Sequence, residues 1–276
     1  MTGQTTNNLA QNDTPFIRVR GLHKRFGDQA VLRGLDLEIP RACTTVILGA
    51  SGGGKSVLLR HLMGLVEPDS GTIEIDGEEI TALNERALGP VRRKIGMLFQ
   101  NGALFDSFNV RENVIFPLRE MGVKNAQELE TKAVEALSLV GLEEHLDKMP
   151  ASLSGGMRKR VALARAIITR PSAVFYDEPT AGLDPIVSDQ INHLIRRTQQ
   201  KFGLTQVVVT HDMRSLYHVA DNILFLREGE IYFTGSPQQL RHCRDPEVRD
   251  FILGRSEESI KAGLPEPGPC DPLPAG

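Results

Sequence analysis

The feature that most constrains the fold is a glycine-rich segment that directly follows an apolar run. Residues 49–56 read GASGGGKS, which fits the phosphate-binding pattern G-x-x-x-x-G-K-[ST]. The preceding TTVIL at 44–48 is typical of a strand buried on both faces, and residues 55–63 carry apolar side chains at helical spacing. A buried strand, such a loop and a helix in this order predict an α/β fold with a mainly parallel sheet.

The residue types of this loop suit a nucleoside triphosphate. Glycines let several backbone N–H groups turn inward toward phosphate oxygens, and the following helix directs the positive end of its dipole to the same point. We expect Lys55 to reach the β- and γ-phosphates and Ser56 to offer a hydroxyl to Mg²⁺. The flanking strand and helix disfavour the alternative, a glycine-rich turn that binds nothing. The residues expected to hold the nucleotide are Gly49, Ala50, Ser51, Gly52, Gly53, Gly54, Lys55 and Ser56.

A second apolar run, AVFYDE at 173–178, ends in two acids. Ligands of α/β sheets bind beyond the carboxyl ends of the strands, where Asp177 can hold Mg²⁺ directly or through water. The neighbouring Glu178 can polarise the attacking water as a general base. The alternative is an acid pair that only caps the next segment, and the phosphate loop argues against it.

Composition narrows the partners and the compartment. A formal net charge of −3 argues against a nucleic-acid backbone as the main partner. No stretch approaches the ~18 apolar residues of a transmembrane helix, and the polar residues 1–15 do not form a secretory signal. Cys43, Cys243 and Cys270 have neither C-x-x-C nor metal spacing, as is typical of unpaired thiols in a reducing compartment. We expect a cytoplasmic protein whose link to a membrane comes through a partner.

Patterns along the chain predict one domain between two tails. Residues 16–22 and 35–39 alternate like strands, and Asp76-Gly77 separates two strand-like runs as a hairpin turn does. Residues of about 101–165 are mostly helical in pattern, and short apolar runs alternate with helical segments after 173. We interpret residues 1–15 as a disordered arm, 16–255 as the folded domain and the proline-rich 256–276 as a flexible tail.

A further anion site is indicated at residues 153–157, LSGGM, which precede the helical segment RKRVALARAII. Ser154 suits an N-cap, and Gly155 and Gly156 leave backbone N–H groups bare at the start of the helix. The cationic side chains at 158–160 interact unfavourably with the positive end of the helix dipole. Binding of an anion or an acidic partner at this helix end would offset that repulsion. A solvated charged face is the alternative.

Together these motifs resemble those of the ABC transporter ATPases, whose signature is usually written LSGGQ. In matching order, Gln100 resembles the family's Q-loop glutamine, residues 181–184 (AGLD) its D-loop and His211 its switch histidine. Phe26 stands where the family places an adenine-stacking aromatic, although a core position is the alternative. The resemblance runs from about residue 16 to 255. It implies a P-loop NTPase (RecA-like) core with an N-terminal antiparallel β subdomain and an inserted α-helical subdomain.

The resemblance also implies cofactors, roles and assembly. The cofactors are ATP and Mg²⁺. The catalytic residues are Glu178, His211, Gln100 and Lys55, and the metal is held by Ser56, Gln100 and Asp177. The chain carries two phosphate-binding helix ends but one set of hydrolytic groups. The family resolves this with a head-to-tail homodimer, in which each ATP lies between the P-loop of one copy and Ser154, Gly155 and Gly156 of the other.

A narrower resemblance comes from Met157 in the signature and from the stretch FQNGALFDSFNVRENVIFPLRE at 99–120. These resemble the ATPases of the Mla phospholipid-trafficking systems. That implies a place on the cytoplasmic face of a bacterial inner membrane, peripheral through an integral permease (MlaE-like), with an MCE-domain lipid carrier (MlaD-like) and a STAS-domain regulator (MlaB-like). It also suggests that the chain after about Pro246 wraps the neighbouring copy, with simple disorder as the alternative.

Two other functions stay open: an importer ATPase for an amino acid or another small solute, and a soluble ABC ATPase acting on nucleic acid or ribosomes. The single cassette and the lack of a basic stripe disfavour the latter. We expect the surface that couples to a partner between Gln100 and the signature. There Phe105, Phe108, Val110 and Phe116 either anchor a partner helix or pack the region's own core.

Overall fold

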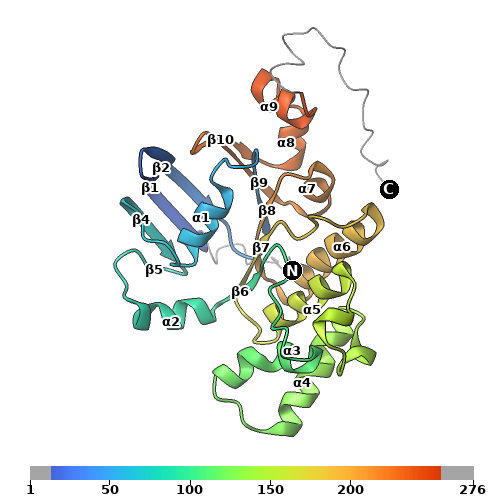
Figure 1. Cartoon of the computed structure of the whole chain (residues 1–276). Helices are drawn as coiled ribbons and strands as arrows, with labels where there is room; N and C mark the ends of the chain where they lie inside the picture. Colours follow the sequence, from blue (N-terminus) through green and yellow to red (C-terminus); the bar gives the residue numbers. More distant parts are fainter. Residues whose placement is uncertain (1–13, 256–276) are drawn as a thin grey trace, which may run out of the picture.

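The computed structural model describes residues 14–255. The predicted arm, apart from residues 14 and 15, and the predicted tail lie outside the described residues. Two sheets and a group of helices make up the described part (Figure 1). The fold class expected from the sequence is confirmed: a mainly parallel α/β core with an antiparallel N-terminal sheet and an added helical region.

The N-terminal sheet is antiparallel, in the order β2-β1-β4-β5. Its strands are β1 (Ile17–Phe26), β2 (Gln29–Ile39), β4 (Ser70–Ile75) and β5 (Glu78–Glu79). Alternation in β1 works as expected, because Ile17 and Val19 are buried while Arg18 pairs with Glu38 of β2. The hairpin at Asp76-Gly77 is present, although its second strand has only two residues.

The central sheet has the order β10-β9-β3-β8-β7-β6. Its strands are β3 (Thr44–Leu48), β6 (Ile95–Leu98), β7 (Ala173–Asp177), β8 (Thr205–Thr210), β9 (Asn222–Arg227) and β10 (Glu230–Gly235). Neighbouring strands run parallel except for β9 and β10, an edge hairpin that the sequence reading did not identify.

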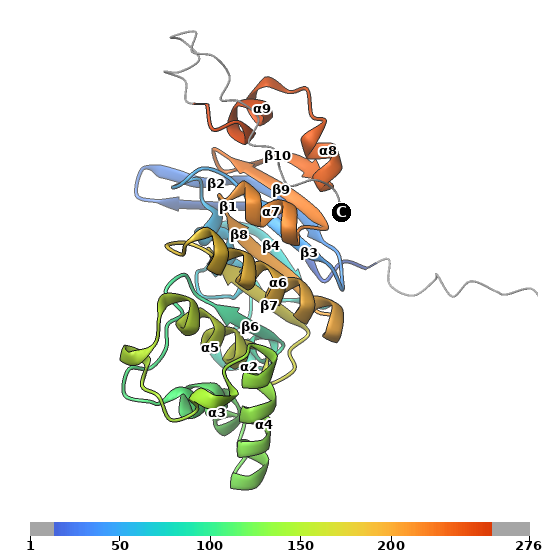
Figure 2. The same ribbon diagram turned by 90° about the vertical axis from the view of Figure 1, so that its right-hand side faces the viewer.

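Helices surround this sheet. They are α1 (Lys55–Leu62), α2 (Glu85–Arg93), α3 (Val110–Glu120), α4 (Ala126–Leu139), α5 (Gly155–Ile167), α6 (Pro185–Phe202), α7 (Met213–Val219), α8 (Pro237–Arg241) and α9 (Pro246–Ile252), with short 3₁₀ turns η1 (Glu143–His145) and η2 (Pro150–Ser152). Figure 2 shows α3 and α4 at one end of the molecule and α8 and α9 at the other. Side-chain caps fix several starts; Asp184, for example, accepts two backbone N–H bonds at the start of α6.

Two apolar cores lie on opposite faces of the central sheet. Val46 and Leu48 of β3 face the core shared with α3 to α7, whereas Ile47 faces the core shared with α1 and the N-terminal sheet. This double burial explains why residues 44–48 are apolar without alternation. The carboxyl ends of the central strands are thereby held in fixed positions.

The last described helix packs on its own chain. Val248 of α9 is buried, Phe251 stacks against Phe225 of β9 with ring centroids 4.8 Å apart, and Glu247 pairs with Arg227. The wrapping of a neighbouring copy after Pro246 therefore stays a prediction for the residues beyond this helix. Within residues 14–255, the length and hydropathy needed to cross a membrane do not occur together in any helix.

Candidate functional site

Most of the predicted functional residues follow parallel strands of the central sheet. The loops after β3, β6, β7 and β8 all leave the same edge, because these four strands run parallel. These loops, with the end of β7 and the start of α1, carry residues 49–56, Gln100, Asp177-Glu178 and His211, which are up to 162 positions apart along the chain (211 minus 49). The sheet thus gathers one candidate centre from four segments.

The glycine-rich loop has geometry that needs glycine at two positions. A Cβ on Gly49 would lie 2.4 Å from the Leu226 carbonyl oxygen, and Gly54 has φ of +94°. Gly54 is also the N-cap of α1 and provides no side-chain cap. The first N–H groups of α1 are therefore not blocked by a capping side chain, as an anion-binding helix end requires.

Lys55 folds back over this loop. Its Nζ donates to the carbonyl oxygens of Gly49 at 2.8 Å and Ala50 at 2.9 Å. Burial lowers the pKa of Lys55, and the nearby carboxylates of Glu178 and Asp177 oppose that shift. The lysine is thus held inside the loop, close to the two acids.

Ser56 and Asp177 meet across 121 residues of sequence. The Ser56 hydroxyl donates to Asp177 Oδ1 at 3.2 Å. Burial raises the pKa of Asp177, and the hydrogen bond from Ser56 only partly counters it. A half-buried carboxylate beside a hydroxyl is an oxygen donor set that suits Mg²⁺. Gln100 lies exposed two residues beyond β6, the strand next to β7.

Glu178 lies in a strained position between two polar groups. Its φ of +48° is uncommon for a residue other than glycine. One carboxylate oxygen lies 2.9 Å from His211 Nδ1, and the other accepts from the Thr210 hydroxyl at 3.3 Å. The carboxylate is only 12% exposed. The structure thus brings together Glu178 and His211, which the sequence connects only through the resemblance, and it adds Thr210, for which no sequence signal was identified.

The position of Lys159 contradicts the alternative that the basic residues 158–160 form only a solvent-exposed charged face. It is buried, and its Nζ donates to the carbonyl oxygens of Glu178 at 3.2 Å and Ala181 at 2.8 Å. Burial lowers the pKa of Lys159 to about 8. This lysine connects α5 to the segment after β7, a contact that its position in a charge run could not indicate.

The signature segment is a different kind of helix start. Ser154 is exposed and caps α5 by accepting from the Met157 N–H at 3.2 Å, as expected. Gly156 is buried, and a Cβ there would lie 2.4 Å from Val187 Cγ1 of α6. Its glycine is therefore required for helix packing, whereas a Cβ on Gly155 would meet Leu183 at 3.4 Å. Helix α5 packs on α3, α4, α6 and β6, while α1 packs on β7 and β8.

The aromatic residues Phe26, Phe105, Phe108 and Phe116 differ in their surroundings. Phe26 is 51% exposed, with Lys24 Nζ 5.5 Å from its ring centre, so the core alternative is wrong. Phe105, Phe108 and Phe116 form one cluster, with ring centroids 4.7–6.0 Å apart. Val110 is fully buried, so it belongs to the core and cannot anchor a partner.

Phe105 remains 41% exposed beside a surface cavity of about 310 Å³. The cavity is lined by Asn101, Ala103, Leu104, Asp106, Pro150, Ala151 and Arg158. Arg165 of α5 donates to the carbonyl oxygens of Gly102 and Ala103, both at 2.8 Å. The segment after Gln100 is thereby tied to the signature helix, a connection that the sequence reading missed.

Comparison with known proteins agrees with this geometry. A family model described as ABC transporter matches residues 32–181, more than half of the chain. The chain is 38% identical over 257 residues to the intermembrane phospholipid transport system ATP-binding protein MlaF of Escherichia coli K12, covering 93% of this chain and 96% of that protein. It is 40% identical over 239 residues to a Mycobacterium leprae protein named "Probable ribonucleotide transport ATP-binding protein mkl", covering 87% and 69%.

A solved structure is also similar. It is a dimeric ATP-binding cassette in a post-hydrolysis state with ADP and phosphate bound. The TM-score is 0.74 at 31% identity, over 80% of this chain and 98% of that one.

Proposed function

The chain belongs to the ABC transporter family, and from that premise we propose that it drives phospholipid transport between bacterial membranes by hydrolysing ATP at the carboxyl edge of its central sheet. The hydrolase activity itself follows from family membership. The observation that carries the site assignment is the meeting of Lys55, Ser56, Asp177, Glu178 and His211 at one edge.

Each of these residues has a distinct role in the proposal. The bare N–H groups of residues 49–56 and the Lys55 ammonium bind the β- and γ-phosphates. The Glu178 carboxylate, held by His211 and Thr210, accepts a proton from the attacking water. His211 then lies next to the γ-phosphate position, where it senses that group. Gln100 is proposed to approach the same phosphate from the loop after β6.

The residues present fit a magnesium ion, with Ser56, Asp177 and Gln100 as its proposed holders. The 3.2 Å contact between the Ser56 hydroxyl and the half-buried Asp177 carboxylate supports this, because a cation there would offset the burial that raises the pKa of Asp177. When bound, the ion would neutralise charge on the β- and γ-phosphate oxygens.

The signature segment supports a composite site in a head-to-tail homodimer. Ser154 is exposed and caps α5, and the first turn of α5 has no acidic residue, whereas Asp177, Glu178 and His211 lie at the P-loop edge. We assign Ser154, Gly155 and Gly156 to the nucleotide bound by the partner's P-loop. Phe26, exposed at the end of β1, is the proposed stacking surface for adenine.

Mixed dimers test this arrangement directly. A Lys55→Ala protein and a Ser154→Arg protein should each be nearly inactive. Mixing them should restore up to about a quarter of the wild-type rate, because half of the dimers are mixed and each has one intact site of two. Rescue should need ATP-dependent exchange of subunits. A mixture as inactive as its parts would argue for sites formed within one chain. A Lys55→Ala/Ser154→Arg double variant mixed with Lys55→Ala provides the matched control and should not be rescued.

Coupling to a permease is proposed at the Phe105 cavity. Phe105 is the exposed member of the aromatic cluster, and Arg165 holds the adjoining residues 102 and 103 to the signature helix, so this surface suits the end of a partner helix. Phe105→Asp should weaken assembly with the permease while leaving the basal hydrolysis of the isolated protein unchanged. Val110 serves no such purpose, because it is buried.

The phospholipid cargo rests on the match to MlaF along almost the whole of both chains. The proposed complex contains an MlaE-like permease, an MlaD-like MCE carrier and an MlaB-like regulator, and it places this chain on the cytoplasmic face of the inner membrane. Residues 16–255 are the proposed ATPase domain, with about 101–165 as its helical part. The ribonucleotide assignment of the Mycobacterium leprae relative supports a second candidate, a small-solute cargo. Lipid transfer by the reconstituted complex, absent with Lys55→Ala, should decide between them.

A further inference from the structure

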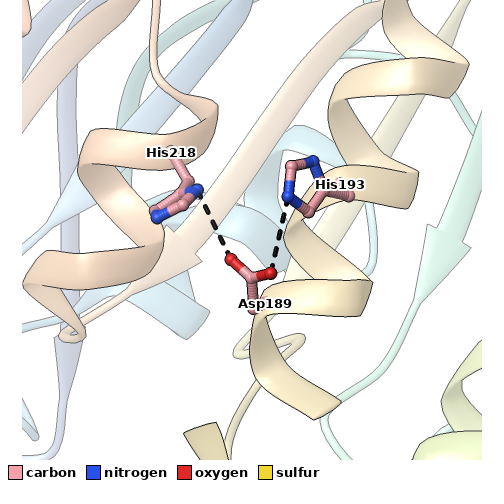
Figure 3. A group of neighbouring side chains, drawn as sticks. All are labelled: Asp189, His193 and His218. Carbon is pink, nitrogen blue, oxygen red and sulfur yellow. Dashed lines mark ion pairs between the residues drawn. The ribbon is translucent and has the colours of Figure 1, made fainter. Parts of the chain in front are cut away.

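Three side chains that commonly bind metals converge between α6 and α7, outside the hydrolytic centre. Asp189 and His193 lie one turn apart on α6, and His218 faces them from α7 (Figure 3). Asp189 Oδ2 is 3.4 Å from His193 Nε2, and Asp189 Oδ1 is 3.7 Å from His218 Nδ1. One ligand atom from each residue lies within 4.8 Å of the other two. The imidazole rings are nearly perpendicular, 6.1 Å apart.

We propose that Asp189, His193 and His218 form a binding site for a transition-metal ion of the Zn²⁺ class. Two imidazoles and one carboxylate are a donor set that suits Zn²⁺, Co²⁺ or Ni²⁺. Bonds of about 2.0 Å in a tetrahedron place neighbouring ligand atoms roughly 3.3 Å apart. The two separations, 3.4 and 3.7 Å, are close to that value although each involves a different oxygen of Asp189, and a water molecule would complete the ligand set from the exposed side of His193.

The distances favour a shared ion over direct hydrogen bonds. Both nitrogen–oxygen separations exceed the 2.7–3.2 Å of ordinary N–H···O bonds. The carboxylate therefore turns one oxygen toward each imidazole without a close bond to either. Ion pairs between such exposed groups contribute little by themselves, so the convergence is better explained by a cation that all three side chains share.

The two helices that carry the ligands are held together independently of any ion. Asn192, next to His193, donates to the Ser215 hydroxyl on α7 at 3.0 Å inside the core. Ser215 is also 3.1 Å from the Thr180 hydroxyl, and Arg196 pairs with Asp221 at 2.6 Å beyond α7. The backbone of the site is thus pre-organised, which reduces the ordering that binding requires.

An ion at this site would affect the hydrolytic centre, an inference that rests on the proposed function. Helix α6 begins at the Asp184 cap, and α7 begins at the Asp212 cap next to His211. An ion held by both helices would resist relative movement of the two segments that flank the hydrolytic centre. Mg²⁺ supplied with ATP would not occupy the site, because Mg²⁺ prefers an all-oxygen octahedral shell.

Metal titration tests the site without any measure of hydrolysis. The full chain, purified without an oligohistidine tag and stripped by a chelator, is titrated with Zn²⁺ by calorimetry in excess Mg²⁺. We expect one more ion per wild-type chain than per His193→Gln/His218→Gln chain, or at least about tenfold weaker binding in the variant, since even changes outside the ligand set cost that much. Equal stoichiometry and affinity in the two proteins would overturn the proposal. Failure of hydrolysis would instead bear on the proposed function.

Controls separate this site from other histidines and thiols. His242→Gln, an exposed histidine bonded to its own helix at Gln238, should bind Zn²⁺ as wild type does; an equal loss there would contradict the assignment. Co²⁺ should give the visible spectrum of tetrahedral nitrogen and oxygen ligation without thiolate charge transfer. Zn²⁺ should also raise the Tm of wild type but not of the double variant, whose metal-free Tm should be close to that of wild type because His193 is exposed and His218 is partly exposed.

Discussion

Two helix starts in this molecule resemble each other locally but differ in what surrounds them. Glycine stands at both starts: Gly54 is the N-cap of α1, and Gly155 and Gly156 are the first residues of α5. Helix α1 carries Lys55 itself, and the ends of β7 and β8 place Asp177, Glu178 and His211 near its start. Around α5, Ser154 satisfies one N–H itself, and Lys159 turns away to bind carbonyl oxygens. In the proposed function, the same local element therefore binds nucleotide and supports hydrolysis in one place and only binds nucleotide in the other.

This difference has a physical origin in the sheet. Helix α1 follows a central strand, so the ends of β7 and β8 lie beside it, whereas α5 follows a loop of the helical region. A helix end attracts an anion through its dipole and bare N–H groups. Proton transfer needs a carboxylate at a fixed place as well. The comparison predicts which substitutions stop chemistry, which loosen packing and which alter only affinity.

The largest effect is expected from Glu178→Gln. The amide cannot accept the proton from water, so ATP turnover should fall by about 10²–10⁴-fold, while nucleotide binding is kept and dimers accumulate with saturating Mg-ATP. Phosphate release and gel filtration measure the two effects. Glu228→Gln is the matched control, because Glu228 also has a positive φ, +50°, but lies in an exposed turn. Turnover within a few-fold of wild type, or a protein that stays monomeric, would remove Glu178 from the base role.

Gly156→Ala should have the next largest effect, on stability. The added Cβ would lie 2.4 Å from Val187 Cγ1, and such overpacking costs about 1–3 kcal/mol in the free energy of unfolding. Gly155→Ala, with its nearest contact at 3.4 Å, should change that free energy by about 0.5 kcal/mol or less. Urea denaturation compares the two, and Val187→Ala should partly rescue Gly156→Ala. Equal losses in both alanine variants would show that helix packing is not what requires glycine.

Phe26→Ala should have a smaller effect, on affinity. Losing an exposed stacking surface should weaken ATP binding by about 0.5–1.5 kcal/mol, roughly 2- to 12-fold. Thermal stability should hardly change, since the ring is half exposed. Phe202→Ala is a close control, because Phe202 is also exposed and has a lysine 5.5 Å from its ring. A fluorescent ATP analogue measures both, and equal affinities for the two variants would contradict adenine stacking on Phe26.

A pH dependence of stability is expected from Lys159. Its pKa is about 8 in the fold and about 10.4 in an unfolded chain. Between these values the unfolded state binds the extra proton, so this residue's contribution to the free energy of unfolding rises with pH. Wild type should therefore gain stability relative to Lys159→Met from pH 8 to pH 10. Denaturation at several pH values, with Lys201→Met as an exposed control, measures the gain; a parallel pH profile for Lys159→Met would refute the shifted pKa.

Much of the fold and of the phosphate loop could be predicted from the sequence. The GASGGGKS segment, the buried strand before it and the acid pair at 177–178 have local signals, because loop geometry and strand burial restrict residue types position by position. The sequence did not predict the edge hairpin β9–β10. The pattern after residue 173 indicates strands alternating with helices, and nothing in it separates an antiparallel pair from that alternation. For Val110 the sequence left two alternatives open, a partner anchor or the core, because an apolar residue has the same identity inside and outside the core; its burial selects the core.

What the sequence by itself determined is the set of groups available for ATP chemistry and their order along the chain. What only the tertiary structure decided is which of them meet. Lys159 reaches the Glu178 carbonyl, Gly156 packs against Val187, and His218 joins Asp189, all through contacts between segments far apart in the sequence. Local sequence patterns indicate backbone conformation, burial and the repeat of a helix or strand. Which side chains from different elements meet depends on how those elements pack.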